Sequence, residues 1–170
     1  MKRIVSLFLL SLLPFLAIAQ EESLQVNNDA LIWRKVYEKG TDVETIAQNL
    51  RALGSFKDIT VSEGMVTAEM SGVSLDYQSL GYKRMSLPIY VVNNKYSAFV
   101  TVQVREGRYR VTAERIKTLN SSYGESDIES FALKNGDLDA KFLDAPAKIL
   151  SSTFDKLFSG LDKTNDDDDW

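Results

Sequence analysis

Two runs of alternating residues on either side of Glu106-Gly107 constrain the fold of this chain more than any other feature. Over residues 96–116 apolar and polar side chains alternate, which is typical of a β-hairpin with a short connection. Closing the hairpin sets apolar side chains opposite one another on one face: Val100 and Ala113, Val102 and Val111, Val104 and Tyr109. Polar pairs then share the other face: Gln103 and Arg110, Thr101 and Thr112. A slip of one residue would put Val102 opposite Arg110 and mix the two faces, so the pattern fixes the register.

Two segments have the spacing of amphipathic helices. Thr41 and Glu44 match a capping box, with Thr41 as the expected N-cap, and Gly54 stands where a helix would stop. Near the C-terminus, Pro146 suits a first turn. The apolar side chains that follow share one helical stripe: Ile149, Leu150, Phe154, Leu157, Phe158 and Leu161. We expect both helices to cover one face of the sheet.

The remaining segments complete an α+β fold class. We expect a strand over 31–38, strands over 57–62 and 65–71 with a bulge at Gly72, and an edge strand over 85–92 that contains Pro88. Ser126 and Glu129 suggest a second capping box. The sequence thus predicts an antiparallel sheet of five to six strands with helices on one face, ordered strand, helix, four or five strands, helix. The expected divisions of the chain are a linker over 20–29, a single domain over 30–161 and an acidic, disordered tail over 162–170.

The N-terminus has the pattern of a cleavable signal peptide over residues 1–19. Lys2 and Arg3 precede an apolar segment, and Ala17-Ile18-Ala19 supplies the small residues that a signal peptidase reads, with cleavage expected near Ala19-Gln20. The apolar segment is shorter than the roughly 20 residues that a membrane-spanning helix needs. We therefore expect an exported protein, periplasmic or secreted, with no membrane span after cleavage.

The composition removes whole classes of chemistry. The chain has no Cys and no His, which excludes thiol nucleophiles, imidazole bases, Ser-His-Asp triads and the common zinc sites. Neither a dinucleotide-binding nor a phosphate-binding glycine loop is present. We expect no cofactor and no metal. Asn135, Asp137 and Asp139 have the spacing of half a calcium loop, but Ala140 replaces the required Gly, so we interpret them as a turn.

Charge is unevenly distributed along the sequence. Residues 83–118 carry eight positive and two negative side chains, whereas residues 119–170 carry five positive and twelve negative ones. In a chain with a net charge of −4 this basic segment is too small to indicate nucleic-acid binding. Attraction to the acidic C-terminal third of the same chain explains the basic segment more simply. The alternative is that the basic segment binds an anionic ligand or partner.

The candidate site lies on the polar face of the hairpin and consists of Gln103, Arg105, Arg108 and Arg110. Arg105 and Arg108 are expected to face each other directly, which is destabilising unless something compensates. Water, the acidic helix or the acidic tail of the same chain could compensate. An acidic protein, peptide or glycan could do so as well, because planar guanidinium groups pair well with carboxylates.

Two stretches resemble a known family. Leu-Ile-Trp-Arg-Lys-Val-Tyr at 31–37 and Val-Arg-Glu-Gly-Arg-Tyr-Arg-Val at 104–111, within residues 30–116, are similar to exported bacterial proteins forming a domain of unknown function with a TBP-like (TATA-binding-protein-like) fold. In that family a late strand begins with a Gly-Arg-Tyr-Arg type of sequence, which Gly107–Arg110 matches. The resemblance implies this fold and a Gram-negative envelope setting, and it implies no activity.

Three functions follow as hypotheses. The first is a non-catalytic module that binds a protein, peptide or glycan with the uncovered sheet face. The second is a hydrolase acting on glycans with two carboxylates, drawn from Glu63, Glu69, Asp76 and Glu114. The third is a structural or inhibitor-like envelope subunit that holds its partner through an apolar patch.

Overall fold

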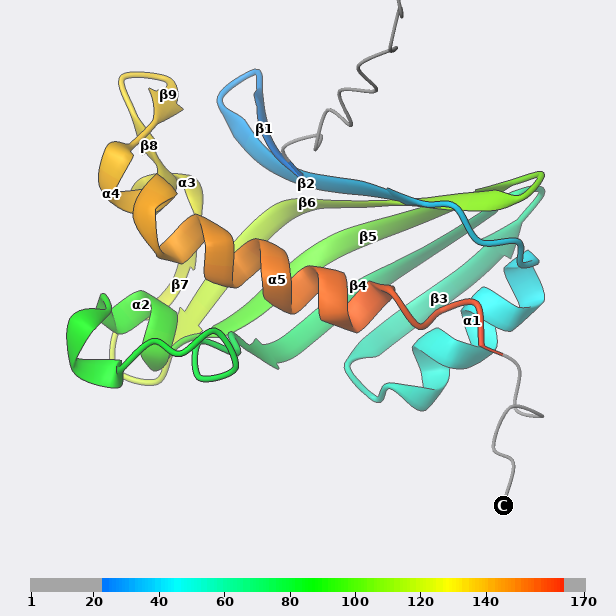
Figure 1. Ribbon diagram of the computed structural model, residues 1–170, viewed down its shortest axis with the longest axis horizontal. Coiled ribbons are helices and arrows are strands. Elements are labelled where there is room, and N and C mark those ends of the chain that lie inside the picture. Colours follow the sequence, from blue (N-terminus) through cyan, green and yellow to red (C-terminus); the bar gives the residue numbers. More distant parts are fainter. Residues whose placement is uncertain (1–22, 164–170) are drawn as a thin grey trace, which may run out of the picture.

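A computed structural model describes residues 23–163 as an α+β fold in which helices lie against one side of an antiparallel sheet (Figure 1). The expected signal peptide over 1–19 and all but the first two residues of the expected tail lie outside this part. The strands are β1 (Leu24–Asn27), β2 (Ala30–Tyr37), β3 (Phe56–Ser62), β4 (Met65–Ser74), β5 (Lys95–Arg105), β6 (Arg108–Asn120), β7 (Gly124–Asp127), β8 (Leu133–Lys134) and β9 (Asp137–Leu138). The helices are α1 (Val43–Ala52), the 3-10 turn η1 (Arg84–Ser86), α2 (Ile89–Val92), α3 (Glu129–Ala132), α4 (Ala140–Asp144) and α5 (Pro146–Phe158).

The main sheet has seven strands in the order β1-β2-β6-β5-β4-β3, with β7 added beside β6, and β8 and β9 form a separate pair. The central β5–β6 hairpin has the register that the alternation predicts: Val102 faces Val111 and Gln103 faces Arg110. Gly107 adopts a left-handed φ of 72° in the two-residue turn, a conformation that glycine reaches without strain. The α+β class and the hairpin register are therefore confirmed.

The first strand, β1, comes from residues that we expected to be a linker. Within 20–29, residues 24–27 form β1 and pair with β2 across a turn at Asn28 and Asp29. Both turn residues have left-handed φ angles, 50° and 59°, which suits the short side chains of Asn and Asp. The alternation of Leu24 and Val26, together with this turn pair, was a hairpin signal that the polar composition of the segment concealed.

Three local predictions were wrong in detail. The N-cap of α1 is Asp42 and not Thr41, because the Asp42 carboxylate accepts the backbone N–H of Thr45 at 2.7 Å. Residues 85–92 form η1 and α2 in place of an edge strand, with Pro88 at the N-cap position of α2. Ser126 lies in β7 and caps no helix, since β6 recruits that segment as a neighbouring strand. At the start of α1 and at β7, a neighbouring group thus outcompeted the local sequence signal.

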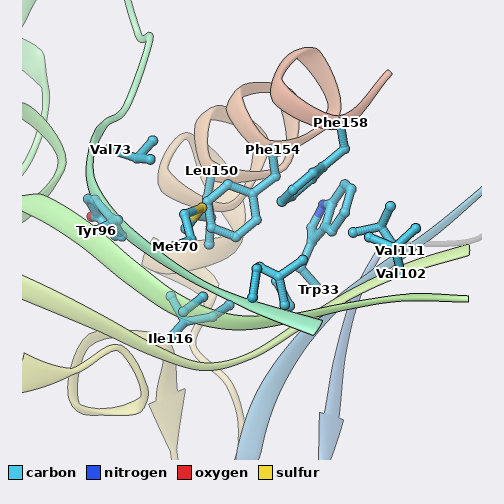
Figure 2. Close-up of a cluster of buried hydrophobic side chains, with 14 of the residues drawn as sticks. Trp33, Met70, Val73, Tyr96, Val102, Val111, Ile116, Leu150, Phe154 and Phe158 are labelled. Carbon is cyan, nitrogen blue, oxygen red and sulfur yellow. The ribbon is translucent and has the colours of Figure 1, made fainter. Parts of the chain in front are cut away.

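One buried layer joins the sheet to α5. Trp33 of β2 is fully buried and packs against Phe154 and Phe158 of α5, with ring centroids 5.6 and 5.5 Å apart (Figure 2). Val102 and Val111 complete this layer from the central hairpin, and both are 0% exposed. The apolar stripe predicted for the last helix is therefore core, and it covers one face of the sheet.

Bulges bend the sheet at neighbouring positions. The register of β4 against β5 shifts between Met70 and Val73, which confirms the bulge expected at Gly72. The β5–β6 register shifts at the same level, where Arg115 has a left-handed φ of 52°. An extra residue in a strand increases its twist, so these shifts curl the sheet around the helices.

Candidate functional site

The open face of the sheet is the side turned away from α5. It carries side chains that alternate with those of the core. Ile32 of β2 is buried there, and the following side chains are at least partly exposed: Arg34, Val36, Met65, Thr67, Glu69, Phe99, Thr101, Gln103, Arg105, Arg110, Thr112 and Glu114. The core residues between them on the same strands, such as Val100 and Ala113, are 0% exposed. The central strands therefore separate a buried face from a solvent-accessible one.

The structure brings the four predicted site residues together. Arg105 lies directly across from Arg108, and Gln103 from Arg110, at the tip of the β5–β6 hairpin. With Val36 of β2 these side chains line a shallow hollow of about 180 Å³. We call the four residues the arginine cluster.

Little of the charge in the arginine cluster is compensated among the described residues, because the partner of Arg110 is a neutral amide oxygen and the one ion pair is weak. Arg110 donates from Nε to the Gln103 amide oxygen at 3.0 Å, and a second donor of the same guanidinium reaches the same oxygen. Arg108 has Glu38 3.9 Å away, but both side chains are more than half exposed, so this ion pair is weak. Within residues 23–163, no ion pair reaches Arg105. The cluster therefore retains unpaired positive charge on an accessible surface.

The acidic C-terminal third does not neutralise the arginine cluster in the part of the chain that the structure describes. There, the one ion pair between residues 83–118 and residues 119–170 joins Lys117 to Glu125, with 2.7 Å between Nζ and Oε1. Asp155 of α5 instead pairs with Lys35 at 2.7 Å on the covered side of the sheet. The expected acidic run at 166–169 lies outside the described residues.

A row of threonines crosses the open face beside the arginine cluster. Thr60, Thr67, Thr101 and Thr112 are successive cross-strand neighbours on β3, β4, β5 and β6, and Arg34 of β2 ends the row. The Arg34 Nε is buried and has no hydrogen-bond partner among the described residues. Neighbouring strands lie about 4.8 Å apart, so the hydroxyls and the guanidinium form a regular polar strip. The sequence reasoning missed this strip, although the Thr101–Thr112 pair pointed to it.

A second hollow, of about 490 Å³, lies farther along the open face. At its centre the Arg115 guanidinium lies over the Phe99 ring, 4.4 Å from the centroid. Two ion pairs also line it, Lys57 with Glu69 at 3.2 Å and Lys117 with Glu125. Two carboxylates thus lie among the four cations that line this hollow, whereas among residues 23–163 no carboxylate lines the hollow at the arginine cluster.

The four candidate catalytic carboxylates do not form one site. Glu69 and Glu114 both flank Phe99 on the open face, two strands apart. Asp76 pairs with Lys156 at 2.9 Å, and this hydrogen bond lowers the pKa of the Asp76 carboxyl. Glu63 lies in the turn between β3 and β4. Glu69 is about half exposed and ion-paired, in contrast to the apolar pocket that a general acid usually occupies.

The segment considered for calcium is a turn between β8 and β9, with left-handed φ angles of 56° at Asn135 and 87° at Gly136. Among residues 23–163, no three Asp or Glu side chains are grouped closely enough to hold a metal ion. Nor does this part of the chain contain a helix with the length and apolar character needed to cross a membrane.

Comparison with solved structures places the fold in the TBP-like class. The chain is similar to a TBP-like protein from Parabacteroides distasonis, with a TM-score of 0.53 and 14% identity over 85% of this chain and 100% of that one. It is also similar to a DUF4468 family protein from Bacteroides ovatus, with a TM-score of 0.54 and 12% identity over 86% of this chain and 94% of that one. No family model and no curated protein matches the sequence. The TBP-like fold that the sequence resemblance implied is confirmed, and at this identity the likeness concerns the fold alone.

Proposed function

We propose that this protein is a non-catalytic binding module whose open sheet face captures an acidic segment of another protein. The observation that carries the proposal is the direct opposition of Arg105 and Arg108 on an uncovered surface. Like charges placed opposite each other destabilise a sheet, and an acidic partner would relieve that repulsion. A surface that costs stability when empty is better explained by binding than by folding.

The chemistry of the face suits carboxylates on an extended chain. A guanidinium presents parallel N–H donors that match the two oxygens of Asp or Glu. The threonine row and Arg34 continue this polar surface next to the arginine cluster, so one extended segment could contact both. Electrostatic attraction of this kind also speeds encounter with an acidic partner.

Export to the periplasm or the medium is part of the proposal. It rests on the signal-peptide pattern over residues 1–19 and on the absence of Cys, which makes the chain indifferent to an oxidising compartment. Intact-mass measurement of protein recovered from separate cell fractions tests it. Removal of residues 1–19 supports export, whereas an uncleaved chain in the cytoplasm contradicts it.

The binding test uses a defined probe, a fluorescent octaglutamate peptide, and measures its anisotropy. We expect binding that weakens at high salt and is lost in the triple variant Arg105→Ser, Arg108→Ser, Arg110→Ser. The matched control removes three exposed lysines from other elements: Lys134→Ser, Lys141→Ser and Lys148→Ser. Both variants change the net charge equally, so equal losses would reduce the effect to bulk charge and contradict the proposed site.

A glycan ligand or a glycan hydrolase is the alternative that Glu69 and Glu114 favour, because they lie on either side of Phe99. Polygalacturonate in place of octaglutamate distinguishes an acidic glycan from an acidic peptide. Release of reducing sugar from a glycan panel, abolished by Glu69→Gln or Glu114→Gln, would establish the hydrolase and overturn the non-catalytic proposal. The open face is polar, which is unlike the apolar patch expected of a structural or inhibitor-like subunit.

A further inference from the structure

A second distinctive surface lies at the opposite end of the sheet from the arginine cluster. η1, α2 and the turn between β6 and β7 gather there, far from the tip of the β5–β6 hairpin (Figure 1). The four most exposed large apolar side chains of residues 23–163 belong to this end: Met85 at 100%, Tyr123 at 84%, Ile89 at 61% and Leu119 at 53%. One exposed apolar side chain needs no explanation, whereas the gathering of these four at one end of the molecule calls for one.

A polar hollow of about 570 Å³ lies at this end of the molecule. Ile89 and Tyr123 stand at its border, while Arg84 and Lys95 supply positive charge. Within the described part of the chain, no carboxylate lines it. The hollow therefore combines cations and neutral donors, and it lacks the acidic neighbours that lessen the charge of the hollow at Phe99.

Hydrogen bonds to neutral oxygens hold the polar groups of this hollow in place. Arg84 donates from Nη2 to the Asn93 amide oxygen at 2.8 Å, and Lys95 donates from Nζ to the Ser74 hydroxyl at 2.5 Å. A neutral partner positions a cation without cancelling its charge. Each cation also keeps further N–H donors, because a guanidinium has five and an ammonium has three.

We propose that this end of the molecule binds the surface of an anionic phospholipid membrane. The phosphate of a headgroup would enter the polar hollow beside Arg84 and Lys95, and Met85 and Ile89 would insert among the outer parts of the acyl chains. The inference is independent of the proposed function, because the two surfaces lie at opposite ends of the sheet.

The arrangement of the apolar side chains favours a lipid surface over a protein partner. Met85 lies on η1, Ile89 on α2 and Tyr123 in the turn between β6 and β7, and the hollow that Ile89 and Tyr123 border is polar. The three side chains therefore form no continuous apolar patch of the kind that a protein interface buries. In a bilayer interface each apolar side chain can insert separately, and anionic headgroups attract nearby cations at about 1 kcal/mol each.

Co-sedimentation with vesicles tests the proposal on protein purified as the expressing cells process it. We expect binding to vesicles that contain phosphatidylglycerol and much weaker binding to phosphatidylcholine alone. Met85→Ser with Ile89→Ser should lower the partition coefficient at least about tenfold. Arg84→Gln and Lys95→Gln should each lower it by roughly fivefold. Because Met85 and Ile89 are exposed, these changes should leave folding intact, which circular dichroism checks.

The matched control makes the same kinds of change elsewhere, with Leu143→Ser on α4 and Lys148→Gln on α5, and should bind vesicles like the unchanged protein. Equal binding to both vesicle types, or no loss in the Met85 and Ile89 variant, overturns the proposal. So does binding of soluble glycerol phosphate without binding to either vesicle type, because the ligand would then be a free phosphate. A dimer that the same two substitutions dissociate, without vesicle binding, would assign the surface to a second copy of the chain.

Discussion

The two faces of the central sheet come from the same strands and differ in almost every physical respect. On β5, Val100 and Val102 are 0% exposed on the side of α5, while the alternate residues Thr101 and Gln103 remain in contact with water. On β2, Trp33 is fully buried and the adjacent Arg34 is not. A change of one position along a strand thus moves a side chain from the core to the candidate binding surface.

This contrast assigns the stability of the fold to the covered face and the proposed binding to the open face. The covered face contains the large buried rings that stabilise the fold, so substitutions there should act through unfolding. The open face buries little and concentrates unpaired positive charge at one end, so substitutions there should act on binding. Each of the following predictions tests one side of this division, and the largest effect comes first.

Phe154→Ala should lower the free energy of unfolding by about 3–5 kcal/mol. Phe154 is 0% exposed and packs edge-on against Trp33, so the substitution leaves a cavity at the centre of the core. Urea denaturation followed by tryptophan fluorescence measures the loss. A loss below about 1 kcal/mol would show that α5 does not cover the sheet as described.

A matched pair of substitutions on β5 compares the two faces directly. Val102→Thr should cost about 1–3 kcal/mol, because it buries a hydroxyl among apolar side chains with no assured partner. Thr101→Val, one residue away on the open face, should change stability by about 0.5 kcal/mol or less. The two urea midpoints measure the difference, and equal losses would refute the division between the faces.

Alkaline pH should lower the free energy of unfolding through Tyr37, which lies on the covered face of the sheet. Burial, together with the hydrogen bond that the Tyr37 hydroxyl donates to Asp155 at 2.9 Å, raises the pKa of Tyr37 well above its usual value. In the unfolded chain Tyr37 ionises near pH 10, whereas in the folded chain it keeps its proton at that pH. The stability from this group is therefore complete below about pH 10 and falls by about 1.4 kcal/mol per pH unit above it.

Tyr37→Phe should remove this part of the alkaline slope, at a cost of about 1 kcal/mol at pH 7 for the lost hydrogen bond. The measurement is the free energy of unfolding of both proteins at pH 7 and pH 11. Parallel losses in the two proteins would mean that Tyr37 ionises as readily in the folded state as in the unfolded state.

Arg105→Gln should have the smallest effect on stability and the opposite sign. Removing one of two facing positive charges should stabilise the hairpin by about 0.2–1 kcal/mol while weakening octaglutamate binding. Thermal denaturation and anisotropy measure the two quantities on one sample. A variant that is less stable and binds equally well would mean that Arg105 serves the fold and not a partner.

Much of the fold was predictable because alternation along the hairpin is a strong local signal. The pairing of Val102 with Val111 follows from the need to keep valines off the polar face, and the stripe from Ile149 to Phe158 follows from helical spacing. The same register places Arg105 opposite Arg108 from the sequence alone. The arginine cluster is therefore a local feature of one hairpin.

Features that depend on distant partners were not predictable in this way. Leu24–Asn27 forms a strand because it pairs with the edge of β2. Ser126 lies in a strand because β6 is long enough to pair with that segment. The threonine row requires the order of four strands, which no single segment encodes. The hollow between Arg84 and Tyr123 joins segments that are distant in the sequence.

The most direct test of the account is a titration of isotope-labelled protein with octaglutamate, followed by NMR chemical-shift changes residue by residue. If the open face is the binding surface, the largest changes will fall on the arginine cluster, with smaller ones along the threonine row, and the amides of α5 will stay unchanged. Changes confined to α5 and the covered side, or no change at the arginine cluster at saturating peptide, would contradict it.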